Sequence, residues 1–184
     1  MESKRNKAIF LDRDGVIDKL LYDHDRGIYS AKDMDDFELI PGSKKAIAKF
    51  KEEGYLVIVI TNQPGLTYGY IKQKDYDEIN IFLKSLGVDD VFTCVHSPDA
   101  KCECRKPSPK MINDASAKYD IDLSKSIMVG DNLSDIKAGK VCGKTVFIGN
   151  KRADIMNLFS ERKIEPGGHF KSLKEATEFI IQEL

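Results

Sequence analysis

Short apolar runs alternate with amphipathic stretches along the chain, and this alternation constrains the fold more than any other feature. The runs are rich in β-branched residues and cover residues 7–11, 55–60, 88–95, 126–129 and 145–148. Continuous runs of this kind are typical of strands buried on both faces of a parallel sheet. The stretches between them predict helices over residues 43–53, 73–86, 109–119, 134–141 and 172–184. The pattern therefore predicts an α/β three-layer sandwich.

Two segments fall outside this alternation. Residues 18–37 are polar and irregular, which suggests a flap or hairpin over the edge of the sheet. Residues 151–170 predict a short helix followed by a loop that contains Pro166-Gly-Gly168. A chain of 184 residues fits one domain over residues 1–184, with no large cap insertion.

The charge balance and the apolar runs limit the classes of partner. The chain has 29 basic and 30 acidic residues, which argues against a dedicated nucleic-acid or membrane-surface binder. The apolar run over residues 56–60 is far too short to span a membrane, and residues 8–11 are too few for the core of a signal peptide. We therefore expect a cytoplasmic protein whose four cysteines are reduced thiols or metal ligands.

Polar clusters follow four of the five apolar runs. They comprise residues 12–16, 61–63, 105–107 (after a cysteine-rich loop) and 130–135. Ligands of open α/β sheets bind outside the carboxyl ends of the strands, so we expect the four clusters to meet in one site.

Three carboxylates in these clusters point to a bound cation. Asp12, Asp14 and Asp131 would repel one another unless a cation held them, and oxygen ligands with room for water and phosphate suit Mg²⁺. A carboxylate that attacks an anionic phosphate ester needs that cation and a further positive charge, which Lys106 can supply.

The remaining groups complete a phosphoryl-transfer site. Thr61 and Asn62 can donate hydrogen bonds to phosphoryl oxygens. One carboxylate attacks while another donates a proton to the leaving alcohol and later activates water. Metal contact would keep Asp12 ionised, whereas Asp14 beside another carboxylate can serve as the acid.

The four clusters resemble, in order, the four motifs of the haloacid dehalogenase superfamily of phosphotransferases: Asp12-Arg-Asp-Gly-Val16, Thr61-Asn62, Lys106-Pro107 and Gly130-Asp131…Asp135. The resemblance implies a Rossmann-like sheet and an aspartyl-phosphate mechanism, with Asp12 as nucleophile and Asp14 as acid/base. It also implies that Thr61 and Lys106 stabilise the phosphoryl group. Asp131 would bind the metal together with Asp12 and the backbone carbonyl of Asp14.

A cysteine-rich loop over residues 94–104 offers a second metal site. Cys94, His96, Cys102 and Cys104 place four soft ligands within eleven positions, a complete tetrahedral set that predicts structural zinc. The alternative is three small buried thiols beside a loop histidine. A zinc ion here would fix the neighbouring Arg105, which can reach a second phosphate or carboxylate of the substrate or lie on the surface as an ordinary arginine.

The pattern Cys-x-His…Cys-x-Cys-Arg-Lys-Pro resembles one branch of the superfamily, which contains D-glycero-D-manno-heptose 1,7-bisphosphate phosphatases and histidinol-phosphate phosphatases. Two segments are more similar to the heptose type, Thr61-Asn-Gln-Pro-Gly65 and Arg105-Lys-Pro-x-Pro109. The resemblance implies a Mg²⁺-dependent phosphatase that acts on a small phosphate ester such as the heptose bisphosphate, with histidinol phosphate as the alternative. Asn62, Gln63 and Arg105 are then the expected substrate-binding residues, and we expect a monomer.

Two further functions fit part of the pattern. A 3′-phosphatase for nucleic-acid ends shares the Asp-x-Asp-Gly motif but should have a basic groove. A phospho-acceptor domain would hold phosphate on Asp12, whereas a second carboxylate at Asp14 favours hydrolysis.

The sequence leaves four residues without a role. His24 is either a substrate contact or a solvated loop residue, and Tyr68 and Tyr70 either line a pocket or cap the sheet. Asp135 has no assigned function at this stage.

Overall fold

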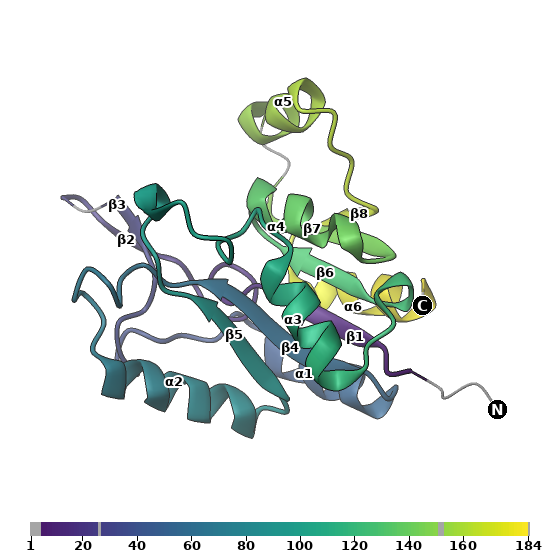
Figure 1. The fold of residues 1–184 in the computed structure, drawn as a ribbon, viewed down its shortest axis with the longest axis horizontal. Coiled ribbons are helices and arrows are strands. Elements are labelled where there is room, and N and C mark those ends of the chain that lie inside the picture. The colour runs from purple at the N-terminus through teal and green to yellow at the C-terminus, as the bar shows by residue number, and fades with distance from the viewer. Residues whose placement is uncertain (1–4, 26, 151–152, 184) are drawn as a thin grey trace.

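Six parallel strands form the central sheet of the protein (Figure 1). The computed structural model describes residues 5–25, 27–150 and 153–183. The strands, in their order across the sheet, are β5 (Asp90–Cys94), β4 (Leu56–Asn62), β1 (Ala8–Leu11), β6 (Ile127–Gly130), β7 (Lys144–Ile148) and β8 (Gly168–Phe170). The predicted α/β architecture is confirmed.

The direction of chain progression reverses at β1. From β1 the chain moves to β4 and then β5 on one side, and it returns to β6, β7 and β8 on the other side. The carboxyl ends of β1 and β6 therefore flank a topological switch point, where open α/β sheets form their ligand site.

Helices cover both faces of the sheet because successive side chains of each strand point to opposite faces. In β1, Ile9 and Leu11 pack in one apolar cluster, while Ala8 and Phe10 pack in another. The first cluster includes side chains of α1 (Ser43–Glu52), α2 (Gln73–Ser85) and α6 (Leu173–Gln182). The second includes side chains of α3 (Lys110–Tyr119) and α4 (Leu133–Ala138). This arrangement gives the three layers expected from the sequence.

The predicted flap contains an antiparallel hairpin. Strand β2 (Leu21–Asp23) pairs with β3 (Gly27–Tyr29) in a separate two-stranded sheet. Three short 3-10 helices complete the described structure, η1 (Pro98–Ala100), η2 (Leu123–Lys125) and η3 (Gly139–Val141).

The structure differs from the sequence-based expectation in two places. Helix α4 ends at Ala138 and continues as the 3-10 turn η3, in which Gly139 lies so close to β6 that a Cβ atom on it would be 2.5 Å from Met128 Cβ. Residues 151–170 contain the expected short helix, α5 (Ala153–Glu161), but also β8, which has no apolar run to indicate it. Strand β8 forms because its backbone pairs with the exposed edge of β7.

In the described part of the chain, no helix combines the length and apolar character needed to cross a membrane.

The packing of α2 gives a matched test of core burial. Ile79 is fully buried, whereas Ile81, two positions away in the same helix, is 70% exposed. We expect Ile79→Ala to lower the free energy of unfolding by about 2–5 kcal/mol, because it leaves a cavity in the core. Ile81→Ala removes the same atoms and should change it by less than about 0.5 kcal/mol. Urea denaturation of both variants measures the difference, and equal losses would contradict the assigned orientation of α2.

Candidate active site

Asp12 and Asp131 follow β1 and β6 on either side of the switch point. The backbone N–H of Asp12 donates to the carbonyl of Val129, 2.9 Å away, which ties the end of β1 to β6. Carboxylate oxygens of Asp12, Asp131 and Asp135 all lie within 4.8 Å of one another. Two of the four predicted motifs therefore meet at one point.

The carboxylate of Asp131 lies directly against Gly15. Gly15 has a φ of +80°, in the region that favours glycine, and its N–H donates to the Asp18 carbonyl at 2.8 Å to close the turn after β1. A Cβ atom on Gly15 would be 2.1 Å from Asp131 Oδ2. Glycine at this position therefore lets the first and fourth motifs approach each other.

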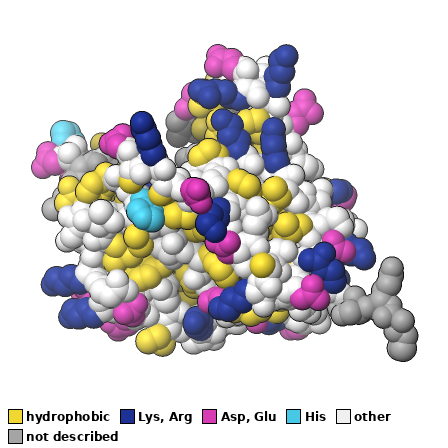
Figure 2. All heavy atoms as spheres, in the orientation of Figure 1, with side chains coloured by type: hydrophobic (Ala, Val, Ile, Leu, Met, Phe, Trp, Pro, Cys, Tyr) yellow, Lys and Arg dark blue, Asp and Glu magenta, His cyan; other side chains and the backbone are white. Residues whose placement is uncertain are grey.

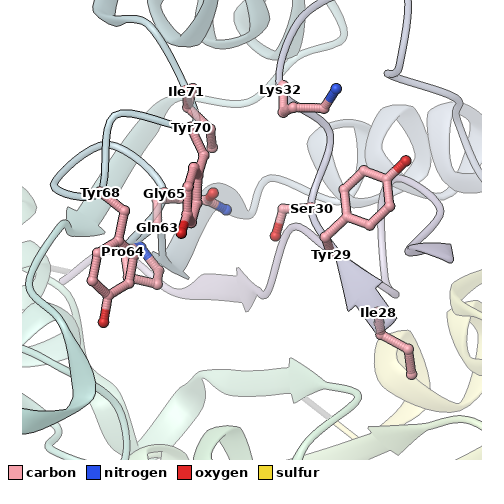
Figure 3. A pocket seen from close by; sticks show the side chains of 10 residues that line it. All are labelled: Ile28, Tyr29, Ser30, Lys32, Gln63, Pro64, Gly65, Tyr68, Tyr70 and Ile71. Atoms are coloured by element: carbon pink, nitrogen blue, oxygen red, sulfur yellow. The ribbon is translucent and has the colours of Figure 1, made fainter. Parts of the chain in front are cut away.

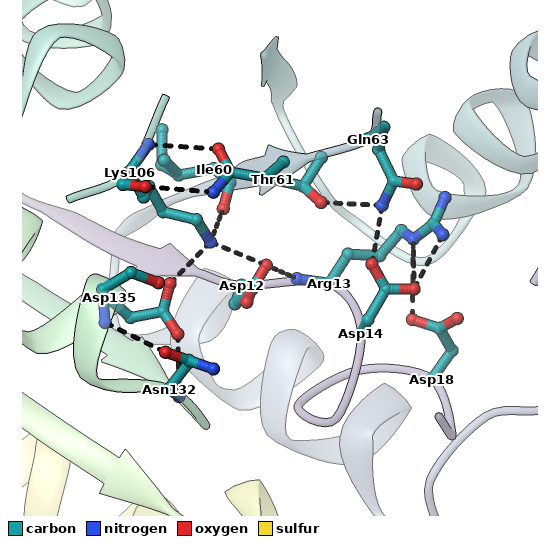
Figure 4. Close-up of polar contacts among 12 residues, drawn as sticks. Asp12, Arg13, Asp14, Asp18, Ile60, Thr61, Gln63, Lys106, Asn132 and Asp135 are labelled. Carbon is teal, nitrogen blue, oxygen red and sulfur yellow. Dashed lines mark hydrogen bonds and ion pairs between the residues drawn. The ribbon is translucent and has the colours of Figure 1, made fainter. Parts of the chain in front are cut away.

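Lys106 brings the third motif to the same point (Figure 4). Its side chain is 1% exposed, and its Nζ lies 2.7 Å from the Ile60 carbonyl, 2.9 Å from Asp12 Oδ1 and 2.6 Å from Asp135 Oδ1. The contact with Ile60 is a hydrogen bond and the contacts with the two carboxylates are ion pairs, so the buried ammonium group has partners from three segments.

Asn62, from the second motif, fixes the backbone of the Lys106 loop. Its Oδ1 accepts from the Lys106 N–H at 3.1 Å, and its Nδ2 donates to the Lys106 carbonyl at 3.3 Å. Arg105 donates from Nη1 to the His96 carbonyl at 3.2 Å, so its side chain lies along the cysteine-rich loop. The predicted substrate contacts of Asn62 and Arg105 stay predictions.

The electrostatics of the cluster favour a cation. Burial raises the pKa of Asp12, and the carboxylates of Asp135 and Asp131 raise it further, although Lys106 lowers it. Burial, Asp135 and Asp14 likewise raise the pKa of Asp131 to about 7, against the opposing effect of Lys106. Burial alone would lower the pKa of Lys106, but Asp12 and Asp135 reverse this effect. One ammonium thus faces more carboxylates than it can neutralise, and the donor set suits Mg²⁺.

The carboxylate of Asp14 lies on the other side of Asp12 from Lys106 (Figure 4). Its Oδ1 accepts from Arg13 Nη2 and Nε at 2.7 and 3.2 Å, and its Oδ2 accepts from Gln63 Nε2 at 2.6 Å. Gln63 Nε2 also lies 2.9 Å from Thr61 Oγ1. Burial and the neighbouring Asp14 raise the pKa of Asp18 to about 8, although Arg13 lowers it.

Two residues of this network were not assigned from the sequence. Asp135 is fully buried, and its Oδ2 accepts from the Asn132 N–H at 2.9 Å as part of a capping box at the start of α4. The spacing of Asn132 and Asp135 is a capping signal that the sequence carries. Arg13 carries no such signal, because an arginine beside two aspartates in a loop usually lies on the surface.

The cysteine-rich loop brings its four predicted ligands together. Cys94 Sγ lies 3.6 Å from both His96 Nδ1 and Cys102 Sγ, and Cys104 Sγ lies 3.3 Å from His96 Nδ1 and 3.7 Å from Cys102 Sγ. A tetrahedral zinc ion with its usual bond lengths requires S–S separations of about 3.8 Å and S–N separations of about 3.5 Å. The arrangement therefore fits zinc, and all four cysteines of the chain are free thiols.

A cavity of about 780 Å³ opens beside Gln63, between the flap and the loop after β4 (Figure 3). Figure 3 shows Tyr29, Ser30 and Lys32 on one side of it and Tyr68 and Tyr70 on the other. The rings of Tyr68 and Tyr70 lie 5.7 Å apart. These two tyrosines therefore line a pocket rather than cap the sheet.

His24 lies in the flap, and its side chain is 96% exposed beside Asp25. It has the setting of a solvated loop residue.

Comparison with known proteins agrees with this geometry. The family model described as haloacid dehalogenase-like hydrolase matches residues 16–148. The chain is 42% identical over 156 residues to the D-glycero-α-D-manno-heptose-1,7-bisphosphate 7-phosphatase of Photorhabdus laumondii. This alignment covers 78% of this chain and 81% of that protein. It is 40% identical over 141 residues to the D-glycero-β-D-manno-heptose-1,7-bisphosphate 7-phosphatase of Helicobacter pylori, which covers 73% and 77%.

A solved structure supports the same relationship. The D,D-heptose 1,7-bisphosphate phosphatase of B. bronchiseptica, crystallised with magnesium and phosphate, superposes with a TM-score of 0.77. It is 31% identical and covers 97% of this chain and 99% of its own. The chain therefore belongs to the haloacid dehalogenase-like hydrolase family. The family and the phosphatase class predicted from the sequence are confirmed.

The contact between Gly15 and Asp131 can be tested with two glycine variants. Gly54 has a φ of +79°, almost the same as Gly15, but nothing lies within 4 Å of a Cβ atom built on it. We expect Gly54→Ala to cost about 1–2 kcal/mol of unfolding free energy, from the left-handed backbone alone. Gly15→Ala should cost at least about 1 kcal/mol more, because Asp131 must also move. Urea denaturation measures both costs, and equal values would show that the contact does not constrain the site.

Proposed function

We propose that this protein is a Mg²⁺-dependent phosphatase that removes one phosphate from D-glycero-D-manno-heptose 1,7-bisphosphate through an aspartyl-phosphate on Asp12. The observation that carries the proposal is that the carboxylates of Asp12 and Asp131 lie close together at the switch point of the sheet, where Lys106 forms an ion pair with Asp12. Relatives named for this substrate are 40–42% identical to the chain. Because these relatives are named for the α and the β anomer, the proposal includes both anomers.

The reaction proceeds in two steps, formation and hydrolysis of the aspartyl-phosphate. An Asp12 carboxylate oxygen attacks phosphorus, the ester P–O bond breaks, and Asp14 donates a proton to the leaving oxygen. Water then attacks the phosphorus of the aspartyl-phosphate, gives its proton to Asp14, and releases inorganic phosphate and the Asp12 carboxylate. Lys106 and Thr61 stabilise the charge on the transferred phosphoryl group. Lys106 already contacts Asp12 at 2.9 Å, which supports this role.

Mg²⁺ would be held by the carboxylates of Asp12 and Asp131 and by the backbone carbonyl of Asp14. When bound, the ion neutralises the carboxylates and lets an anionic ester approach. Asp135 is better suited to hold Lys106, because its two oxygens already face Lys106 Nζ and the Asn132 N–H.

The pocket between the flap and the loop after β4 is suited to the leaving group. Gln63 lines the pocket and also donates to Asp14, so the pocket opens beside the proposed acid. Tyr68 and Tyr70 offer aromatic faces to a sugar ring, and Lys32 offers a cation. Asn62, Gln63 and Arg105 are proposed to contribute to substrate binding, and Arg105 would reach the second phosphate.

We also propose that zinc, bound by Cys94, His96, Cys102 and Cys104, holds the loop that carries Lys106. The separations of these ligand atoms support the proposal. The ion would fix the neighbouring Arg105 through the same loop.

The proposed setting is a monomeric unit over residues 1–184 that acts on a small molecule in the cytoplasm. The four cysteines form no disulfide, which is consistent with a reducing compartment. On the face drawn in Figure 2, basic and acidic side chains are interspersed rather than gathered into one basic area. This distribution favours a small phosphate ester over a nucleic-acid end.

The activity can be tested with a panel of phosphate esters. We expect phosphate release from heptose 1,7-bisphosphate to exceed release from histidinol phosphate and from a 3′-phosphorylated oligonucleotide. EDTA should abolish it and added Mg²⁺ restore it. Asp12→Asn should lower kcat by at least about 10³-fold, because the nucleophile is lost. Asp114→Asn, which changes an exposed acid on α3, is the matched control.

Each contrary result has a distinct meaning. Faster turnover of histidinol phosphate would replace the substrate, and a long-lived phosphoprotein without turnover would indicate a phospho-acceptor. Full activity of Asp12→Asn would refute the mechanism.

The zinc site can be tested by metal analysis. We expect about one zinc ion per chain by mass spectrometry of the purified protein, since the four ligands form a closed tetrahedral set. Cys102→Ser should lose most of this zinc and lower the melting temperature. Cys142→Ser should retain it, because Cys142 lies outside the ligand cluster. Wild-type protein without zinc would contradict the assignment.

A further inference from the structure

Arg13 has the largest side chain that is fully buried among the described residues. Its Nη2 and Nε both donate to Asp14 Oδ1, and its Nε lies 3.7 Å from Asp18 Oδ1 (Figure 4). Buried ion pairs can often be replaced by apolar residues without loss of stability. Stability alone therefore does not explain an arginine at this position, whereas a need for fixed geometry does.

Gln63 holds the other oxygen of the same carboxylate. Its side-chain amide donates to Asp14 Oδ2 at 2.6 Å and is itself only 1% exposed. The same nitrogen contacts Thr61 Oγ1 at 2.9 Å, so the amide is anchored to the end of β4. Asp14 is thus held at both oxygens by groups from two different motifs.

The count of lone pairs identifies one remaining position on Asp14. A carboxylate offers about four acceptor positions. Arg13 occupies two at Oδ1, and Gln63 occupies one at Oδ2. Among the described residues, nothing else donates to this carboxylate, so one position at Oδ2 is left for a proton.

We propose that Arg13 and Gln63 are positioning residues that fix the Asp14 carboxyl group, so that the remaining position on Oδ2 exchanges the proton in both steps of the reaction. The inference rests on the proposed function, in which Asp14 is the acid and the base. The proton on Oδ2 moves to the leaving oxygen as the ester P–O bond breaks and the Asp12–phosphorus bond forms. A proton from water returns to Oδ2 in the second step.

The physical reason is the narrow geometry of proton transfer. The acid must lie within hydrogen-bond reach of the leaving oxygen, and small displacements cost large factors in rate. The planar guanidinium of arginine donates through two N–H bonds at once, which a lysine ammonium does not reproduce in the same geometry.

The test compares leaving groups, because only a poor leaving group needs the proton. In Arg13→Lys we expect kcat/KM to fall about 10–100-fold for the alkyl phosphate that the wild type hydrolyses fastest. For p-nitrophenyl phosphate, which leaves without a proton, we expect a fall of less than about 3-fold. The ratio kcat/KM reports the first step, in which phosphate moves to Asp12. Arg162→Lys, at an exposed arginine after α5, is the control and should match the wild type.

A double-mutant cycle separates positioning from a general structural role. Asp14→Asn should reproduce the dependence on the leaving group, and Arg13→Lys should cause little further loss in the Asp14→Asn protein. Gln63→Leu removes the second hold on Asp14. Its loss of kcat/KM for the alkyl phosphate should largely vanish in the Asp14→Asn protein, whereas a loss from direct substrate contact would add, so the test stays decisive if Arg13→Lys does not fold.

Equal losses on both esters, or additive losses in the cycle, would overturn the inference while leaving the proposed function intact. A wild-type protein that hydrolyses neither ester would overturn the proposed function and the inference together.

Discussion

The buried ammonium group of Lys106 is the contact on which the rest of the site depends. It joins the carbonyl at Ile60 in β4, the carboxylate of Asp12 after β1 and the carboxylate of Asp135 in α4. A buried ammonium without such partners would be strongly unfavourable, so the three strand ends and the Lys106 loop must take up their positions together. The same contact leaves an excess of carboxylates, which a bound cation would balance.

Two supports hold the loop that places Lys106. The side chain of Asn62 binds both backbone groups of Lys106, and the cysteine-rich loop ends directly before Arg105. The parallel sheet thus brings the carboxylates together, and the short cysteine-rich loop leads to the Lys106 ammonium group that contacts them. The pocket between the flap and the loop after β4 opens beside Gln63, whose side chain holds Asp14.

Much of this arrangement follows from the order of the motifs. Parallel strands end at the same edge of a sheet, so Asp12, Thr61 and Asp131 had to meet once the apolar runs were recognised as strands. Strand β8 escaped recognition because its three residues include a glycine and a histidine and it depends on pairing with β7. The close approach of Gly139 to β6, where α4 changes into η3, is a tertiary contact that no local signal indicates.

The amino-acid sequence by itself determined the class of fold, the candidate reactive groups and the two candidate metal sites, because residue types and their spacing carry that information locally. Only the tertiary structure decided which partners each group has. Arg13 turns into the core to hold Asp14, Gln63 binds Asp14 across the turn, and Asp135 faces Lys106. The contacts of Gln63 with Asp14 and of Asp135 with Lys106 join segments that are distant in the chain. The direction of the Arg13 side chain depends on how the layers pack around it.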